Sequence, residues 1–209
     1  MSLLIDWAMM GKHGLLPAAY QQVEYLESLH NTGDVEIPYT PQLGDGMRIT
    51  VEFLSRERSG NCFHVGPGSG VRFSVRALLS GDNYIYTINM TSVTRAPIKQ
   101  TDLNVWYTVE MRGDGVCTAT DTATGTILGT TNNPQTTVPD GNMIYLFKGA
   151  NDYNNSEMRI GEVVVTRGGA DLFHLWPCYR KADSVMGYYD TVGKTFYAVT
   201  NAFAKGANL

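Results

Sequence analysis

Strict alternation of apolar and polar side chains is the feature of this sequence that most constrains its fold. In GMRITVEFLS, residues 46–55, every second side chain from Met47 to Phe53 is apolar, and the side chains between them are polar. A period of two places the apolar set on one face of a β-strand. GVRFSVRALL (residues 70–79) and NYIYTINM (residues 83–90) repeat this period. All three segments therefore predict strands with one buried face.

A β-hairpin is predicted over residues 104–121, NVWYTVEMRGDGVCTATD. The first strand alternates through Val105, Tyr107, Val109 and Met111, and the second returns through Val116, Thr118 and Thr120. The turn between them is Arg112-Gly113-Asp114-Gly115, and its glycines supply the positive φ that tight hairpin turns need.

Further strand signals follow at residues 124–130, 142–149, 157–167 and 171–181. The second of these, NMIYLFKG, is almost wholly apolar, as expected of a strand that is buried on both faces. The third ends at Gly168-Gly169, where we expect a turn. Pro177 lies in the last segment and cannot donate to a β-ladder, so that segment is expected to be a sheet edge or to leave the sheet there.

Roughly a dozen short strands separated by turn signals are typical of a sandwich or a barrel. The chain has 209 residues, enough for one large domain that buries roughly 70% of its unfolded surface without a disulfide or a metal. The predicted fold class is therefore all-β, a two-sheet antiparallel jelly-roll sandwich.

Charge and cysteine content exclude several functional classes. The net charge is −4 and the arginines are scattered singly, so there is no basic stripe of the kind that binds nucleic acid. Three widely spaced cysteines argue against a disulfide framework. Cys62 and His64 lie two residues apart without further ligands, so we interpret them as a buried thiol beside a packed histidine rather than a zinc site.

Residues 1–15 differ from the rest of the chain and are predicted to form an N-terminal arm outside the domain of residues 16–209. Asp6 interrupts the apolar run and no basic region precedes it, so a signal peptide is not expected, and the run is too short to span a bilayer. Helical spacing brings four apolar side chains of this arm near one face: Leu3, Leu4, Trp7 and Met10. The arm either anchors the domain to a larger assembly or folds back over an edge of its own sandwich.

Motifs at the two ends of residues 16–209 carry a resemblance to a known family. LPAAYQQVEYLES opens the domain at Leu16–Ser28, and LWPCYRKADSVMGYYDTVGKTFY closes it at Leu175–Tyr197. With the hairpin at 104–129 and the segment at 158–181, this pair resembles a concanavalin A-like, or laminin-G-like, jelly roll of the kind found in phage structural proteins and gut-bacterial surface proteins. The resemblance implies the fold but no particular activity. The chain departs from the family pattern at LHNTGDVEIP, which follows EYLES.

The closing segment is rich in side chains that also serve in active sites, but its local pattern predicts a structural seam. MGYYD and TFYAV flank the turn TVGK, which is typical of a hairpin whose aromatic side chains pack across the strands. Asp190 is expected to bind backbone amides of its own turn, and Arg180 is expected to pair with Asp183 or with Asp190.

The sequence offers no acid pair for glycoside hydrolysis. Two carboxylates on one strand face must be separated by an even number of residues, whereas Glu24 and Glu27 are separated by three. No Gly-x-Ser-x-Gly elbow occurs, and GPGSG at residues 66–70 lacks the Lys-Ser/Thr of a phosphate loop. We therefore predict that the protein is not an enzyme.

A glycan-binding surface is predicted from two sets of alternating side chains. Trp106, Glu110 and Arg112 share the polar face of one strand, and Arg72 and Arg76 share a face of another, so both sets line one solvent face if the strands lie in one sheet. The alternative is that such a face is merely solvated or packs against a neighbouring subunit. The loop of residues 149–157, GANDYNNSE, is either a plain turn or a site for a sugar or Ca²⁺. No other cofactor is expected.

The resemblance and the arm together predict a non-enzymatic phage virion structural protein: a head-decoration, head-fibre or tail-associated protein whose lectin-like domain binds surface glycans. We expect it to be made in the host cytoplasm, to reside in the virion, to form a homo-oligomer and to contact other virion proteins through the arm. No nucleic-acid or membrane partner is expected. The alternative is a carbohydrate-binding adhesin module on a bacterial cell surface, and the third class is a glycoside hydrolase.

Overall fold

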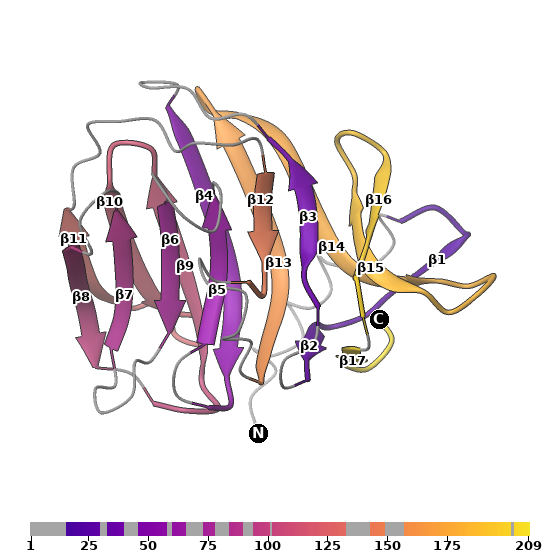
Figure 1. Cartoon of the computed structure of the whole chain (residues 1–209), viewed down its shortest axis with the longest axis horizontal. Coiled ribbons are helices and arrows are strands. Elements are labelled where there is room, and N and C mark those ends of the chain that lie inside the picture. Colours follow the sequence, from indigo (N-terminus) through magenta and orange to yellow (C-terminus); the bar gives the residue numbers. More distant parts are fainter. Residues whose placement is uncertain are drawn as a thin grey trace.

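The structure is a computed structural model that describes residues 16–29, 33–39, 46–57, 60–65, 73–77, 84–89, 94–100, 102–132, 143–148, 157–201 and 203–209, with the backbone alone from 60 to 100. The strands in these ranges form two antiparallel sheets that face each other, as Figure 1 shows. Nowhere in the described ranges is there a helix with the length and apolar character to cross a bilayer.

The larger sheet has 11 strands, and its main path runs β11-β10-β9-β4-β13-β14-β15-β16. Along that path the strands are β11 (Ile127–Asn132), β10 (Val116–Asp121), β9 (Trp106–Arg112), β4 (Met47–Ser55), β13 (Met158–Arg167), β14 (Ala170–Arg180), β15 (Met186–Asp190) and β16 (Thr195–Ala198). Three short strands complete it: β1 (Tyr20–Gln22) pairs with β14, β2 (Leu26–Ser28) pairs with β13, and β17 (Phe203–Lys205) pairs with β2.

The smaller sheet has six strands in the order β3-β12-β5-β6-β7-β8. They are β3 (Val35–Pro38), β12 (Met143–Leu146), β5 (Gly60–Val65), β6 (Phe73–Ala77), β7 (Tyr84–Asn89) and β8 (Thr94–Gln100). The described core lies between the sheets: Ile37, Ile144 and Leu146 of the smaller sheet and Ile49, Val51, Val109 and Val163 of the larger one are fully buried. The predicted all-β, two-sheet antiparallel sandwich is confirmed.

Alternation predicts strand faces well, with two corrections. On β4, Met47, Ile49, Val51 and Phe53 face the core as expected. On β10 the inward residues are Cys117 and Ala119 rather than the set beginning at Val116, because the register places Cys117 opposite the buried Met111. The apolar run on β12 is not buried on both faces, since only Ile144 and Leu146 of that strand are buried.

The predicted turns are present, with one refinement. The β9–β10 turn follows Arg112, and of its two glycines only Gly115 has a positive φ, of 90°. Gly168 and Gly169 both have positive φ in the β13–β14 turn. β14 continues through Pro177, but its pairing with β13 ends at Leu175, so the strand leaves that neighbour before the proline.

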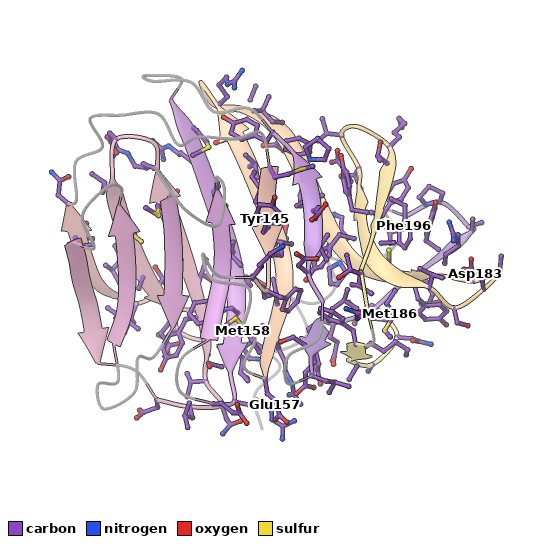
Figure 2. The ribbon with its side chains drawn as sticks, in the orientation of Figure 1. Tyr145, Glu157, Met158, Asp183, Met186 and Phe196 are labelled. Carbon is purple, nitrogen blue, oxygen red and sulfur yellow. The ribbon has the colours of Figure 1, made fainter. Side chains whose placement is uncertain are left out.

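Beyond Leu175, β14 pairs instead with β1 and β15. Figure 1 shows β1, the end of β14 and the β15–β16 hairpin projecting past β3, the edge of the smaller sheet. We call these strands the projecting end. In Figure 2, Asp183 marks its far tip and Phe196 lies on β16.

The closing segment is a structural seam, as predicted. Tyr188 is fully buried, and its hydroxyl donates a hydrogen bond of 2.9 Å to the carbonyl oxygen of Ile160. Asp190 accepts hydrogen bonds from the backbone amides of Val192 and Gly193 in its own turn. Of the two expected partners of Arg180, the structure selects Asp183, at 2.6–3.1 Å.

Candidate functional site

The larger sheet has an outer face, turned away from the core, that carries most of its polar side chains. On β4, β9 and β13 the inward residues are apolar, so the residues between them point outward. Cross-strand register joins the outward residues into rows, such as Thr50 beside Glu110 and Leu54 beside Trp106. This face holds the part of the predicted glycan site that lies on β9.

The structure separates the residues predicted to bind glycans. Trp106, Glu110 and Arg112 share the outer face of β9, as expected. Arg76, however, lies on β6 in the smaller sheet, and Arg72 lies outside the described residues. The condition that both strands belong to one sheet is wrong, because β6 and β9 lie in different sheets, and Arg76 is therefore not on the sheet of Trp106.

Two of the three β9 residues are engaged in exposed ion pairs. Glu110 lies 3.5 Å from Arg48, and Arg112 pairs with Asp114 of the turn. Because a strand rises about 3.4 Å per residue, Trp106 and Arg112 are separated by about 20 Å along β9. These residues therefore cannot surround a single sugar ring together.

Trp106 instead belongs to a compact group at the other end of β9. Its ring centroid lies 5.8 Å from that of Tyr25, and the guanidinium carbon of Arg159 lies 4.4 Å from the Tyr25 centroid. Leu54, which lies between Trp106 and Arg159 in the register, is only 4% exposed although it faces outward. The group therefore forms an aromatic surface that packs on the side chain of Leu54.

A buried carboxylate fixes the cations of this group. Glu27 is 6% exposed, and its two oxygens accept hydrogen bonds from Arg56 at 2.8 Å and Arg159 at 3.1 Å. Hydrogen bonding to Glu27 raises the pKa of Arg56, and Glu157 lies 3.9 Å from the same guanidinium. We call Tyr25, Glu27, Arg56, Trp106 and Arg159 the Trp106 patch; Glu157, at its border, lies near the ends of β4 and β13 (Figure 2).

Sequence reasoning named Trp106 but missed the rest of the patch. Tyr25 and Glu27 come from the segment around β2, Arg56 follows β4, and Arg159 comes from β13. No local sequence pattern could have identified these four residues, because their segments are far apart in the chain. The pairing of β13 with both β2 and β4 brings the segments together.

A second polar group on the outer face is centred on His174. Its Nε2 lies 2.5 Å from Glu162 Oε1, and its ring stacks on Trp176 with centroids 4.9 Å apart. The hydrogen bond to Glu162 raises the pKa of His174, with further contributions from the charges of Glu162, Asp171 and Asp190. The pair therefore holds a proton more firmly than an exposed histidine would.

Glu52 and Glu162 come from adjacent strands of the same face, a relation that the search for acid pairs within one strand could not detect. A side chain added at Gly161 would place its Cβ 3.3 Å from Glu52 Oε2, so Glu52 leans over the irregular register at residues 160–163 of β13. Glu162 is hydrogen-bonded to His174.

A metal ion in a protein is commonly held by histidine, cysteine and acidic side chains. In the described ranges, no three such side chains are arranged to hold a metal ion. Residues 149–156 of the predicted sugar or Ca²⁺ loop lie outside those ranges, as do Leu3, Leu4, Trp7 and Met10 of the arm. Those assignments stay predictions.

No family model matches this sequence. No curated protein matches it either. Solved structures do match. A native heptameric SAP-like pentraxin from Limulus polyphemus has a TM-score of 0.54 and 10% identity, covering 91% of this chain and 96% of the pentraxin chain.

In two further solved structures, this chain matches a smaller share of the other chain. A "putative carbohydrate binding protein" from Bacteroides ovatus has a TM-score of 0.52 and 12% identity over 90% of this chain and 62% of the other. Tailspike protein 2 of Escherichia coli O157:H7 bacteriophage CAB120 has a TM-score of 0.48 and 12% identity over 77% of this chain and 27% of the tailspike. Together with the strand order of the two sheets, the pentraxin and Bacteroides likenesses show that the chain has a concanavalin A-like jelly-roll fold.

Proposed function

We propose that this protein is a lectin-like, non-enzymatic protein that binds neutral glycans at the Trp106 patch. The observation that carries the proposal is the contact of the Trp106 and Tyr25 rings, 5.8 Å apart, beside two guanidiniums held by one buried carboxylate. The Bacteroides ovatus protein, whose name describes carbohydrate binding, supports it as a protein of the same fold.

The patch offers both kinds of contact that a sugar needs. An aromatic ring packs against the apolar C–H face of a pyranose, and guanidinium and carboxylate groups hydrogen-bond to its hydroxyls. Arg56 and Glu157 at the border are 43% and 36% exposed, so both are accessible to a ligand. Because Glu27 already orients Arg56 and Arg159, little side-chain entropy is lost on binding. The charges of Arg56, Arg159, Glu27 and Glu157 cancel, which favours a neutral ligand.

A glycan array comparing the wild-type protein with Trp106→Ala tests the proposal. We expect the strongest neutral ligands to lose about three- to tenfold in affinity, the range that one aromatic contact provides. Ile127→Ala is the matched control, since Ile127 is 66% exposed on β11 of the same sheet. Trp106→Phe should restore most of the binding. Equal binding by wild type and Trp106→Ala would refute the site.

We propose that the protein does not cleave the glycans it binds. Acid–base hydrolysis needs two carboxylates that reach the substrate at a suitable separation, and Glu162 is instead engaged by His174 at 2.5 Å. Incubation with the array ligands should release no reducing sugar. Release by the wild type that disappears in Glu52→Gln or Glu162→Gln would show that the protein is a hydrolase.

We also propose that the protein is a virion component, as head decoration, head fibre or tail-associated protein. The support is the resemblance of the end motifs Leu16–Ser28 and Leu175–Tyr197 to those of phage structural proteins. In this proposal residues 1–15 dock onto other virion proteins and the domain assembles as a homo-oligomer. Deletion of residues 1–15 should abolish incorporation into purified particles while leaving array binding unchanged. Detection of the protein on bacterial cell surfaces and not in particles would favour the adhesin alternative.

A further inference from the structure

A groove of about 390 Å³ opens between the projecting end and the strand β17. Its volume lies within the range of small-molecule sites. Figure 2 shows Met186 of β15 in this region, close to β17. The lining residues come from three strands, β14, β15 and β17, and from the β14–β15 turn: Tyr179, Ser184, Met186, Phe203, Ala204 and Lys205.

The walls of the groove are held in place. Tyr179 and Met186 are directly paired across β14 and β15. On the other side, Phe203 is 5% exposed and packs edge-on against Phe147 with centroids 4.9 Å apart. β17 is in turn paired with β2, so every lining residue except Ser184 lies on a paired strand.

The groove has an aromatic wall and a single charge. Lys205 Nζ lies 5.2 Å from the centroid of the Tyr179 ring and 3.0 Å from Asn208 Oδ1. None of the described residues that line the groove carries a carboxylate. The nearby Asp183 accepts a hydrogen bond from Arg180, which lowers the pKa of Asp183. The Asp183 carboxylate therefore pairs with Arg180. The groove therefore favours an anion.

We infer that this groove binds an acidic sugar residue, a pyranose bearing a carboxylate, as a second glycan site separate from the Trp106 patch. The sugar ring packs against Tyr179 and Met186, its carboxylate pairs with Lys205, and Ser184 is available to its hydroxyls. The inference rests on the proposed glycan-binding function and names a second substrate class for it. Tyr179 lies on the inward-facing side of β14 with Leu175, whereas the Trp106 patch lies on the outer face, so one ligand cannot occupy both sites.

Titration of the isotope-labelled full chain with glucuronate, glucose and acetate, followed by amide chemical shifts, tests the inference. Glucuronate should shift the amides of Met186, Ala204 and Lys205, and glucose and acetate should bind at least about fivefold more weakly, because each lacks one of the two contacts. Lys205→Gln should weaken glucuronate binding about three- to fivefold, the range of one exposed ion pair. Lys194→Gln, an exposed lysine in the β15–β16 turn, is the matched control and should change nothing.

Several outcomes would overturn the inference. These are the absence of shifts in the three groove amides, unchanged affinity in Lys205→Gln, or equal binding of acetate and glucuronate. Tyr179→Phe keeps the ring and should bind glucuronate as the wild type does. Tyr179→Ala removes the ring and should bind glucuronate more weakly. Trp106→Ala should leave glucuronate binding intact, and Lys205→Gln should leave neutral-glycan binding intact. Failure of the groove is therefore distinguishable from failure of the Trp106 patch.

Discussion

At the scale of single residues, the buried carboxylate of Asp190 determines how the closing hairpin packs. Asp190 is fully buried and accepts hydrogen bonds from three backbone amides, of His174, Val192 and Gly193, at 2.8–3.0 Å. Because a buried carboxylate is tolerated only when such donors surround it, Asp190 specifies both the β15–β16 turn and the docking of that turn on β14. Asp190, one of the acids that gave the closing segment the look of an active site, therefore serves folding.

At His174, we predict a pH-dependent contribution to stability. Its pKa in the folded protein is raised above the ordinary value of 6.5, chiefly by Glu162. The stabilisation is therefore fully present below pH 6.5 and is lost as the pH rises through the folded pKa. Imidazole resonances followed by NMR should titrate above 6.5 in the wild type and nearer to it in Glu162→Gln. Glu110→Gln, which removes a carboxylate paired with Arg48 instead, is the control. An unchanged His174 titration in Glu162→Gln would contradict the assignment.

At the scale of elements, the β15–β16 hairpin depends on a residue without a side chain. Gly187 pairs with Ala198 across the hairpin. A Cβ at Gly187 would overlap the carbonyl oxygen of Tyr197 and lie 2.8 Å from the ring of Phe196. Phe196 also packs against Tyr20 of β1, at 5.2 Å, so the hairpin and β1 are coupled through this ring.

We therefore predict that Gly187→Ala lowers the free energy of unfolding by about 1–3 kcal/mol, the usual cost of overpacking. The matched control is Gly113→Ala, whose Cβ would have its nearest contact at an ordinary 3.5 Å, from Met47. That variant should change stability by no more than about 0.5 kcal/mol. Urea unfolding of both variants provides the comparison, and equal stability of the two would show that the close approach at Gly187 is unimportant.

At the scale of the whole molecule, the sequence predicted which segments are strands far better than which strands meet. Side-chain alternation is a local property, so β4 and β9 and their buried sets follow from it. The closing hairpin follows from its turn residues and flanking aromatics, but the burial of four consecutive residues on β15 does not follow from alternation. Sheet membership is not local: nothing near Arg76 indicates that β6 joins the smaller sheet while β9 joins the larger one. For the same reason Tyr25 and Arg159, 134 residues apart in the numbering, could not be assigned to Trp106 in advance.

The most direct test of the central claim is to locate a bound neutral oligosaccharide on the molecule. Amide chemical shifts should be recorded while the strongest neutral ligand from the array is added to the full chain. We predict that the shifts cluster at Tyr25, Trp106 and Arg159 and are lost in Trp106→Ala. Shifts confined to the smaller sheet, or none with any neutral oligosaccharide, would contradict the account.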